Sequence, residues 1–201
     1  MLKKVLLSAV SLLTLSICAA DLTEVFKIDS SSALDGAEGI EKKADGFEFT
    51  DKSLWKQPIS FNPANAEIEL DAVFNLTPPD PAAKRKYNLI YRVNDVKRRQ
   101  VGALLIVQYP NNKRVLVNFT IFTTDKKPVV CQKSMLLEMG VDHSIKVQMT
   151  KEYIALVIDG KVANKVPCNA ELNAPATIIF GNQGGNNAAN MLLKKFTVKS
   201  N

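Results

Sequence analysis

The sequence is poor in histidine and cysteine, which limits the chemistry open to it. Its 201 residues include one histidine, His143, and three cysteines. A structural zinc centre needs about four thiolate or imidazole ligands, so we expect no such metal site and no metal cofactor. His143 directly precedes an alternating segment, and we expect a turn or strand-edge residue there rather than a catalytic base.

The familiar motifs of nucleotide-dependent and serine-type enzymes are also missing. The sequence contains no P-loop, no glycine-rich dinucleotide fingerprint and no nucleophile elbow. One tryptophan, Trp55, and four tyrosines provide few stacking platforms for a sugar-cleaving groove. Helix periodicity and internal repeats are absent as well. These absences favour a binding or structural protein built from strands.

The first residues have the organisation of a cleaved signal peptide. Two lysines precede the apolar stretch Val5–Ile17, which is too short to span a bilayer comfortably. Small residues follow, and they predict cleavage after Ala20. We therefore expect residues 1–20 to be removed and residues 21–201 to be secreted or periplasmic, or held at the outer surface, with no membrane span. Lipid anchoring at Cys18 is the alternative, although the preceding Ile17 is bulky for a lipidation motif.

Positive charge is mild and locally clustered. The formal net charge of +6 falls to +4 when the two lysines of the signal peptide are lost. The densest basic runs are Lys84-Arg85-Lys86 and Lys97-Arg98-Arg99, and each flanks an expected turn without interleaved aromatic residues. Solvated loops account for such runs better than a nucleic-acid interface does. The two cysteines left after cleavage, Cys131 and Cys168, could form a disulfide in an oxidising compartment or remain buried thiols.

Strand signals recur along the whole mature chain. Residues 144–150 alternate between apolar and polar side chains, Tyr153–Ile158 is apolar on both faces, and Asp159-Gly160 favours a two-residue hairpin turn. About twelve such segments follow one another, with turn signals roughly every eight to twelve residues. The pattern predicts one all-β domain over residues 21–201, a two-sheet antiparallel β-sandwich of jelly-roll type.

The order of these segments resembles a known superfamily. The segments SIKVQMT, YIALVIDGKV, PATIIFGNQGG and LLKKFTVKS, with AEIELDAVFNL earlier, look like the concanavalin A-like lectin/glucanase superfamily, specifically its laminin G-like branch. The resemblance spans most of Ala66 to Ser200. It implies a β-sandwich that binds a polysaccharide or an extracellular or cell-surface protein. Lys194-Lys195 stand where that branch usually has a closing acidic pair.

One strand carries the sharpest catalytic candidate. In Glu67-Ile68-Glu69-Leu70-Asp71 the three carboxylates share one face at about 7 Å intervals. A carboxylate pair at such a separation can hydrolyse glycosides. The stretch is similar to the E-x-D-x-E strand of lichenase-type β-glucanases, which implies Glu67 as nucleophile and Asp71 as the acid. The alternatives are the plain polar face of an amphipathic strand, or a weak calcium site.

Binding candidates lie elsewhere in the chain. The loop residues Asn182, Gln183, Asn186 and Asn187 carry amides, which can both donate to and accept from sugar hydroxyls. Trp55 follows a polar stretch and is a candidate surface platform, and Glu69 is a further contact candidate. The leading hypothesis is a secreted, non-catalytic carbohydrate- or partner-binding domain. A glycoside hydrolase using Glu67 and Asp71 and an adhesion domain without a small-molecule site are the alternatives.

Overall fold

A computed structural model describes residues 22–65, 67–77, 86–109, 112–181 and 190–201. The predicted signal peptide and the amide loop at 182–189 lie outside these described residues. Within them the chain is all-β, as predicted. Thirteen strands are present, one more than expected. Their bounds are β1 Thr23–Asp29, β2 Glu38–Lys43, β3 Gly46–Pro58, β4 Glu67–Leu76, β5 Lys86–Asn94, β6 Gln100–Tyr109, β7 Asn112–Phe122, β8 Pro128–Leu136, β9 Asp142–Thr150, β10 Tyr153–Ile158, β11 Lys161–Pro167, β12 Thr177–Phe180 and β13 Met191–Ser200.

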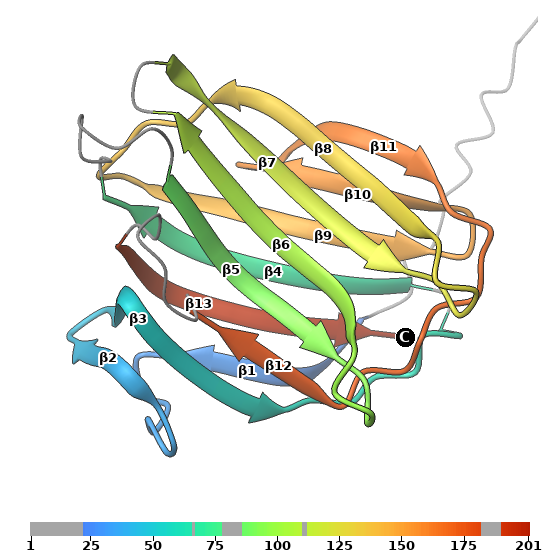
Figure 1. Ribbon diagram of the computed structural model, residues 1–201, viewed down its shortest axis with the longest axis horizontal. Coiled ribbons are helices and arrows are strands. Elements are labelled where there is room, and N and C mark those ends of the chain that lie inside the picture. Colours follow the sequence, from blue (N-terminus) through green and yellow to red (C-terminus); the bar gives the residue numbers. More distant parts are fainter. Residues whose placement is uncertain (1–21, 66, 78–85, 110–111, 182–189) are drawn as a thin grey trace, which may run out of the picture.

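The strands form two antiparallel sheets that share β3. The first sheet runs β11-β10-β9-β4-β13, and β13 pairs on its other side with β1 and with the start of β3. The second sheet begins at the end of β3 and continues β12-β5-β6-β7-β8. Figure 1 shows β5 to β8 lying across β4, β9 and β13. The predicted sandwich is therefore confirmed.

The core lies between the sheets and follows the alternation in the sequence. On β4, every second residue from Ile68 to Leu76 is at most 1% exposed, because alternate side chains point to the same face. The turn at Asp159-Gly160 has positive φ at both residues, 48° and 75°, which is the geometry of a two-residue hairpin. Local patterning thus accounts for both the strand and its turn.

Trp55 corrects one expectation. It is 1% exposed and belongs to the core, not to the surface. Its ring lies 5.0 Å from that of Phe47 and 6.0 Å from that of Phe180. Because the whole indole is covered, it offers no stacking platform to a ligand.

The two cysteines are free thiols, so the alternative of a disulfide is not realised in this structure. Cys131 on β8 is fully buried, and its Sγ lies 3.7 Å from the carbonyl of Ile154. Cys168 follows β11 and is 5% exposed. Burial raises the pKa of the Cys131 thiol, so this thiol is held in its protonated, unreactive form.

The free edges of the two sheets meet on one side. The Asn164 side chain on β11 donates a hydrogen bond of 2.9 Å to the Gln132 carbonyl on β8. This contact joins the last strand of one sheet to the last strand of the other, which limits pairing with foreign strands there. The described residues contain no helix of the length and hydrophobicity that a membrane crossing requires.

Candidate functional site: a polar groove at one end of the sandwich

One end of the sandwich is crossed by a connecting segment, residues 168–176, between β11 and β12. Backbone hydrogen bonds hold it to both neighbours: Thr124 N donates to Glu171 O at 3.0 Å, and Ala176 N donates to Asn94 O at 2.8 Å. The Asn173 Nδ2 adds a 3.0 Å bond to the Phe122 carbonyl. A loop that would otherwise be mobile is thereby fixed against the strand ends, as a binding surface requires.

Two hairpin turns of matching geometry stand beside this segment. In the β5–β6 turn, Arg98 N donates to Asp95 O and Asp95 N donates to Arg99 O. In the β7–β8 turn, Lys126 N donates to Thr123 O and Thr123 N donates to Lys127 O. The fourth residue of each turn is left-handed, with φ of 61° at Arg98 and 64° at Lys126.

The turns and the crossing segment enclose two adjoining hollows, which we call the end groove. The narrow hollow, about 390 Å³, is lined by Arg99, Gln100, Val101, Phe122, Thr123, Thr124, Lys126 and Asn173. The wide hollow, about 600 Å³, is lined by residues 62–64, Thr124, Thr150, Lys151 and residues 169–174. Thr124 and Asn173 line both. Together the hollows are of the size that small-molecule sites have in proteins.

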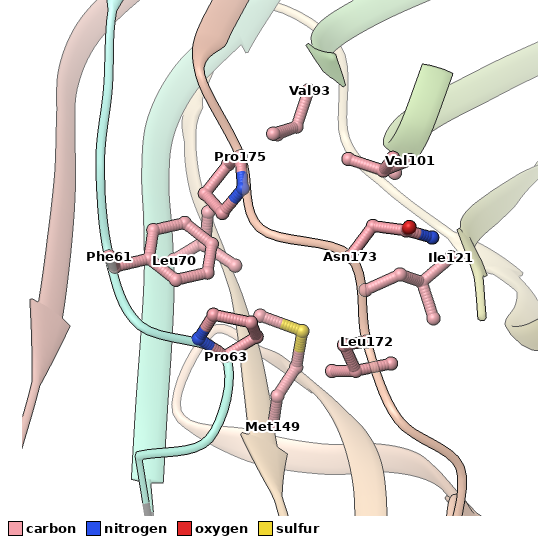
Figure 2. A pocket seen from close by; sticks show the side chains of 11 residues that line it. Phe61, Pro63, Leu70, Val93, Val101, Ile121, Met149, Leu172, Asn173 and Pro175 are labelled. Carbon is pink, nitrogen blue, oxygen red and sulfur yellow. The ribbon is translucent and has the colours of Figure 1, made fainter. Parts of the chain in front are cut away.

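An apolar chamber lies beneath the groove, between the sheets. Figure 2 shows side chains from both sheets and from the crossing segment converging there, among them Leu70, Met149 and Ile121. Its free volume is about 20 Å³, room for roughly one water molecule. The chamber is therefore nearly filled by side chains. Asn173 lines the chamber as well as both hollows, and it is the polar residue between them.

Two carboxylates stabilise the turns beside the narrow hollow. Asp95 is 6% exposed and accepts hydrogen bonds from the backbone N–H groups of Lys97 and Arg99, both at 2.9 Å, and from the Arg99 guanidinium at 2.6 and 2.8 Å. Burial works to raise the pKa of Asp95, but these bonds and the Arg99 charge outweigh it, and the pKa lies below its ordinary value. In the second turn, the hydrogen bonds from Lys127 and the Thr123 hydroxyl lower the pKa of Asp125 to about 2. Both carboxylates are therefore ionised, and both are engaged by hydrogen bonds and an ion pair within their own turns.

The acidic strand predicted as a catalytic site lies elsewhere, on the outer face of the first sheet. Glu69 is 8% exposed and accepts from Gln148 Nε2 at 2.8 Å and from Lys146 Nζ at 2.9 Å. Asp71 accepts a 2.8 Å bond from the Ser144 hydroxyl. Neither the two hollows of the end groove nor the chamber is lined by Glu67, Glu69 or Asp71.

The electrostatics of Glu69 are those of a cross-strand ion pair. Burial acts to raise its pKa, but the hydrogen bonds from Lys146 and Gln148, together with the Lys146 charge, lower it below the ordinary value. A general acid needs the opposite shift. Glu69 therefore serves to join β4 to β9, which are register partners at this point.

The histidine singled out from the sequence has a structural role, and the amide residues proposed for ligand binding lie outside the described residues. His143 is 7% exposed; its Nδ1 lies 2.8 Å from Asp159 Oδ2 and its Nε2 lies 2.8 Å from the Glu138 carbonyl. It thus ties the β8–β9 connection to the β10–β11 turn. Asn182, Gln183, Asn186 and Asn187 lie outside the described residues. Among the residues that are described, no group of three or more histidine, cysteine, aspartate or glutamate side chains is placed to hold a metal ion.

The residues that form the end groove were not singled out from the sequence. Asn169 and Asn173 stand in a short polar stretch between two strands, CNAELNAP, which reads as an ordinary connection. The sequence predicts a solvated loop at Lys97-Arg98-Arg99, whereas the structure places the last of these residues in the lining of the narrow hollow. The sequence feature that could have indicated this site is the pair of amide residues, Asn169 and Asn173, in a connection that is too polar to be a strand.

Comparison with known proteins identifies the fold class. No protein-family model matches the sequence, and no curated protein does. Solved structures match over most of the chain. A legume lectin-like domain from Entamoeba histolytica has a TM-score of 0.61 at 9% identity, covering 89% of this chain and 98% of that one.

Two further structures match similarly. A carbohydrate binding module from Bacillus subtilis has a TM-score of 0.54 at 10% identity, covering 89% of this chain and 95% of that one. An alginate lyase from Pseudomonas aeruginosa has a TM-score of 0.54 at 11% identity, covering 82% and 86%. At these identities the likeness shows the fold alone, a jelly-roll β-sandwich.

Proposed function

We propose that this chain is a secreted, non-catalytic carbohydrate-binding domain and that the end groove is its binding site. The observation that carries the proposal is the lining of the groove. Amide and hydroxyl side chains line it: Asn169 and Asn173 on the crossing segment that backbone hydrogen bonds fix, and Asn62, Gln100 and Thr124 beside that segment. Amides both donate and accept, and so they match the hydroxyl groups of a sugar.

The acid content of the groove favours binding over hydrolysis. Its described lining includes one carboxylate, Glu171, whereas glycoside hydrolysis uses a pair of carboxyl groups. The lectin-like and carbohydrate-binding neighbours and the laminin G-like resemblance support a binding role. The predicted signal peptide supports export to a compartment where such domains meet polysaccharides.

The proposal is tested by affinity electrophoresis of the mature protein through gels containing soluble neutral polysaccharides, starting with dextran, xyloglucan and β-glucan. We expect at least one of them to retard the protein. Asn169→Ala removes an exposed amide of the wide hollow and should weaken that retardation about fivefold, the effect of one hydrogen bond.

Asn190→Ala is the matched control, because Asn190 is likewise exposed but precedes β13, at the opposite end of the strands. It should bind as the wild type does. Equal losses in the two variants would place the site outside the end groove. If neither neutral nor charged polysaccharides retard the protein, the domain is an adhesion or structural module instead.

A further inference from the structure

The narrow hollow carries positive charge that its own surroundings leave available. Arg99 and Lys126 are its charged lining residues, and no carboxylate lines it. Lys126 is exposed, and its side chain forms no hydrogen bond or ion pair with any residue that the structure describes. The Arg99 guanidinium contacts Asp95 through Nε and Nη2, and its side chain is 54% exposed. Arginine has five N–H donors, so several remain free to bind a ligand.

The neighbouring carboxylates pair with Arg99 and Lys127 and leave the charge of Lys126 uncompensated. Asp95 is saturated by two backbone N–H groups and by Arg99. Asp125 is paired with Lys127 Nζ at 2.8 Å and accepts from the Thr123 hydroxyl. Both acids thus serve their own turns, and the uncompensated positive charge in the narrow hollow is that of Lys126, beside the free N–H donors of Arg99.

The backbone adds an independent observation. Arg98 and Lys126 occupy the same position in the two turns, with φ of 61° and 64°. Glycine and asparagine adopt this left-handed conformation at less cost than a long side chain does. A cation stands at both positions in place of the residue that the turn favours. The left-handed conformation gives Lys126 no local advantage over glycine, and the charge of Lys126 lies in the lining of the narrow hollow.

We infer that the narrow hollow binds the negatively charged group of an acidic polysaccharide. This inference rests on the proposed carbohydrate function and specifies its substrate class. The charged group is a carboxylate, as on a uronic acid, or a sulfate ester, since both present the oxygens that arginine and lysine bind. Neutral hydroxyls of the same sugar chain would lie along the wide hollow, against Asn169 and Thr124.

Isothermal titration calorimetry tests the inference with four polymers on the mature protein: dextran, dextran sulfate, polygalacturonate and poly-aspartate. We expect dextran sulfate or polygalacturonate to bind more tightly than dextran, and the affinity to fall as sodium chloride is raised. Whichever anionic glycan binds better identifies the group as sulfate or carboxylate.

Lys126→Gly removes the charge and suits the left-handed backbone, so the variant should fold at least as well as the wild type. We expect it to lose about two- to fivefold in affinity for the anionic glycan at low salt, as for one exposed ionic contact. Lys133→Gln, an exposed lysine on β8 with no ion pair to a described residue, is the control with the same change in charge. It should bind as the wild type does.

The outcomes separate the two proposals. If dextran binds as tightly as both charged glycans, or if Lys126→Gly binds the anionic glycan as the wild type does, the anion site is wrong while carbohydrate binding stands. If poly-aspartate binds as well as the anionic glycans, the hollow is an anion site but its selectivity for sugar is refuted. Absence of binding to all four polymers, and to the neutral polysaccharides above, overturns both proposals.

Discussion

Gly181, directly after β12, is a position at which a single added methyl group meets both backbone strain and a steric collision. Its φ is 87°, in the left-handed region. A Cβ built there lies 2.7 Å from the backbone oxygen and from Oγ of Ser53, and 2.9 Å from Cδ1 of Phe49. Gly181→Ala therefore combines backbone strain with a collision against β3, the strand that belongs to both sheets.

The two costs can be estimated separately. A left-handed conformation costs an alanine about 1–2 kcal/mol, and forcing an extra methyl group into a packed site costs about 1–3 kcal/mol. Alanine also lowers the conformational entropy of the unfolded chain, which offsets about 0.4–1 kcal/mol of this loss of stability. We therefore expect Gly181→Ala to lower the free energy of unfolding by about 2–4 kcal/mol, which in a domain of this size lowers Tm by about 5–15 °C.

Two other glycines isolate the contributions. Gly160 has φ of 75° but nothing within 4 Å of a built Cβ, so Gly160→Ala should cost only the net strain, about 1 kcal/mol. Gly46 lacks a positive φ, but its built Cβ lies 2.3 Å from the Leu193 carbonyl oxygen, so Gly46→Ala reports the collision alone. Urea denaturation followed by the fluorescence of Trp55 measures all three. The reasoning is refuted if Gly181→Ala costs no more than Gly160→Ala.

Two further predictions concern titration and thiol chemistry. The pKa of Asp95 is lowered on folding, so its carboxylate stabilises the protein above the ordinary value of 3.8 and this contribution is lost as the pH falls through the lower folded value. Denaturation curves should show wild type losing more stability below that pH than Asp95→Asn, and parallel losses would contradict the assigned hydrogen bonds. Because Cys131 and Cys168 are buried, a disulfide-exchange reagent such as dithionitrobenzoate should react slowly with the native protein and titrate two thiols in urea; no reaction in urea without reductant would reveal a disulfide.

The sequence was informative wherever a local pattern decides the structure. The alternation of β4 predicts which of its side chains are buried, and Asp159-Gly160 predicts its turn, because both depend on neighbours within a few residues. Trp55 was wrongly expected at the surface. Its burial depends on Phe47 and Phe180, and Phe180 approaches only when β12 pairs with β3.

The candidate site could be predicted even less, because its residues come together only through contacts between distant parts of the chain. Its lining comes from the β5–β6 turn, the β7–β8 turn, the crossing segment at 168–176, residues 62–64 and the β9–β10 turn. These parts are distant in sequence and meet only when both sheets have formed. No periodicity encodes this meeting. The carboxylates of β4 are conspicuous in the sequence because they alternate, yet at least two of them are engaged by neighbouring strands: Glu69 by Lys146 and Gln148, and Asp71 by Ser144.

The pairing of the first strands sets the order in which the molecule can assemble. β1 pairs with β13, and β3, besides its hairpin with β2, pairs with β12 and β13, so both strands need partners near the end of the chain. Contacts between such distant residues form late, because a long loop must close first. A chain that leaves the ribosome from its N-terminus therefore cannot complete its sandwich until the last strand has been synthesised. Until then, pairing is open to β5 to β8, each of which pairs with its neighbour in sequence.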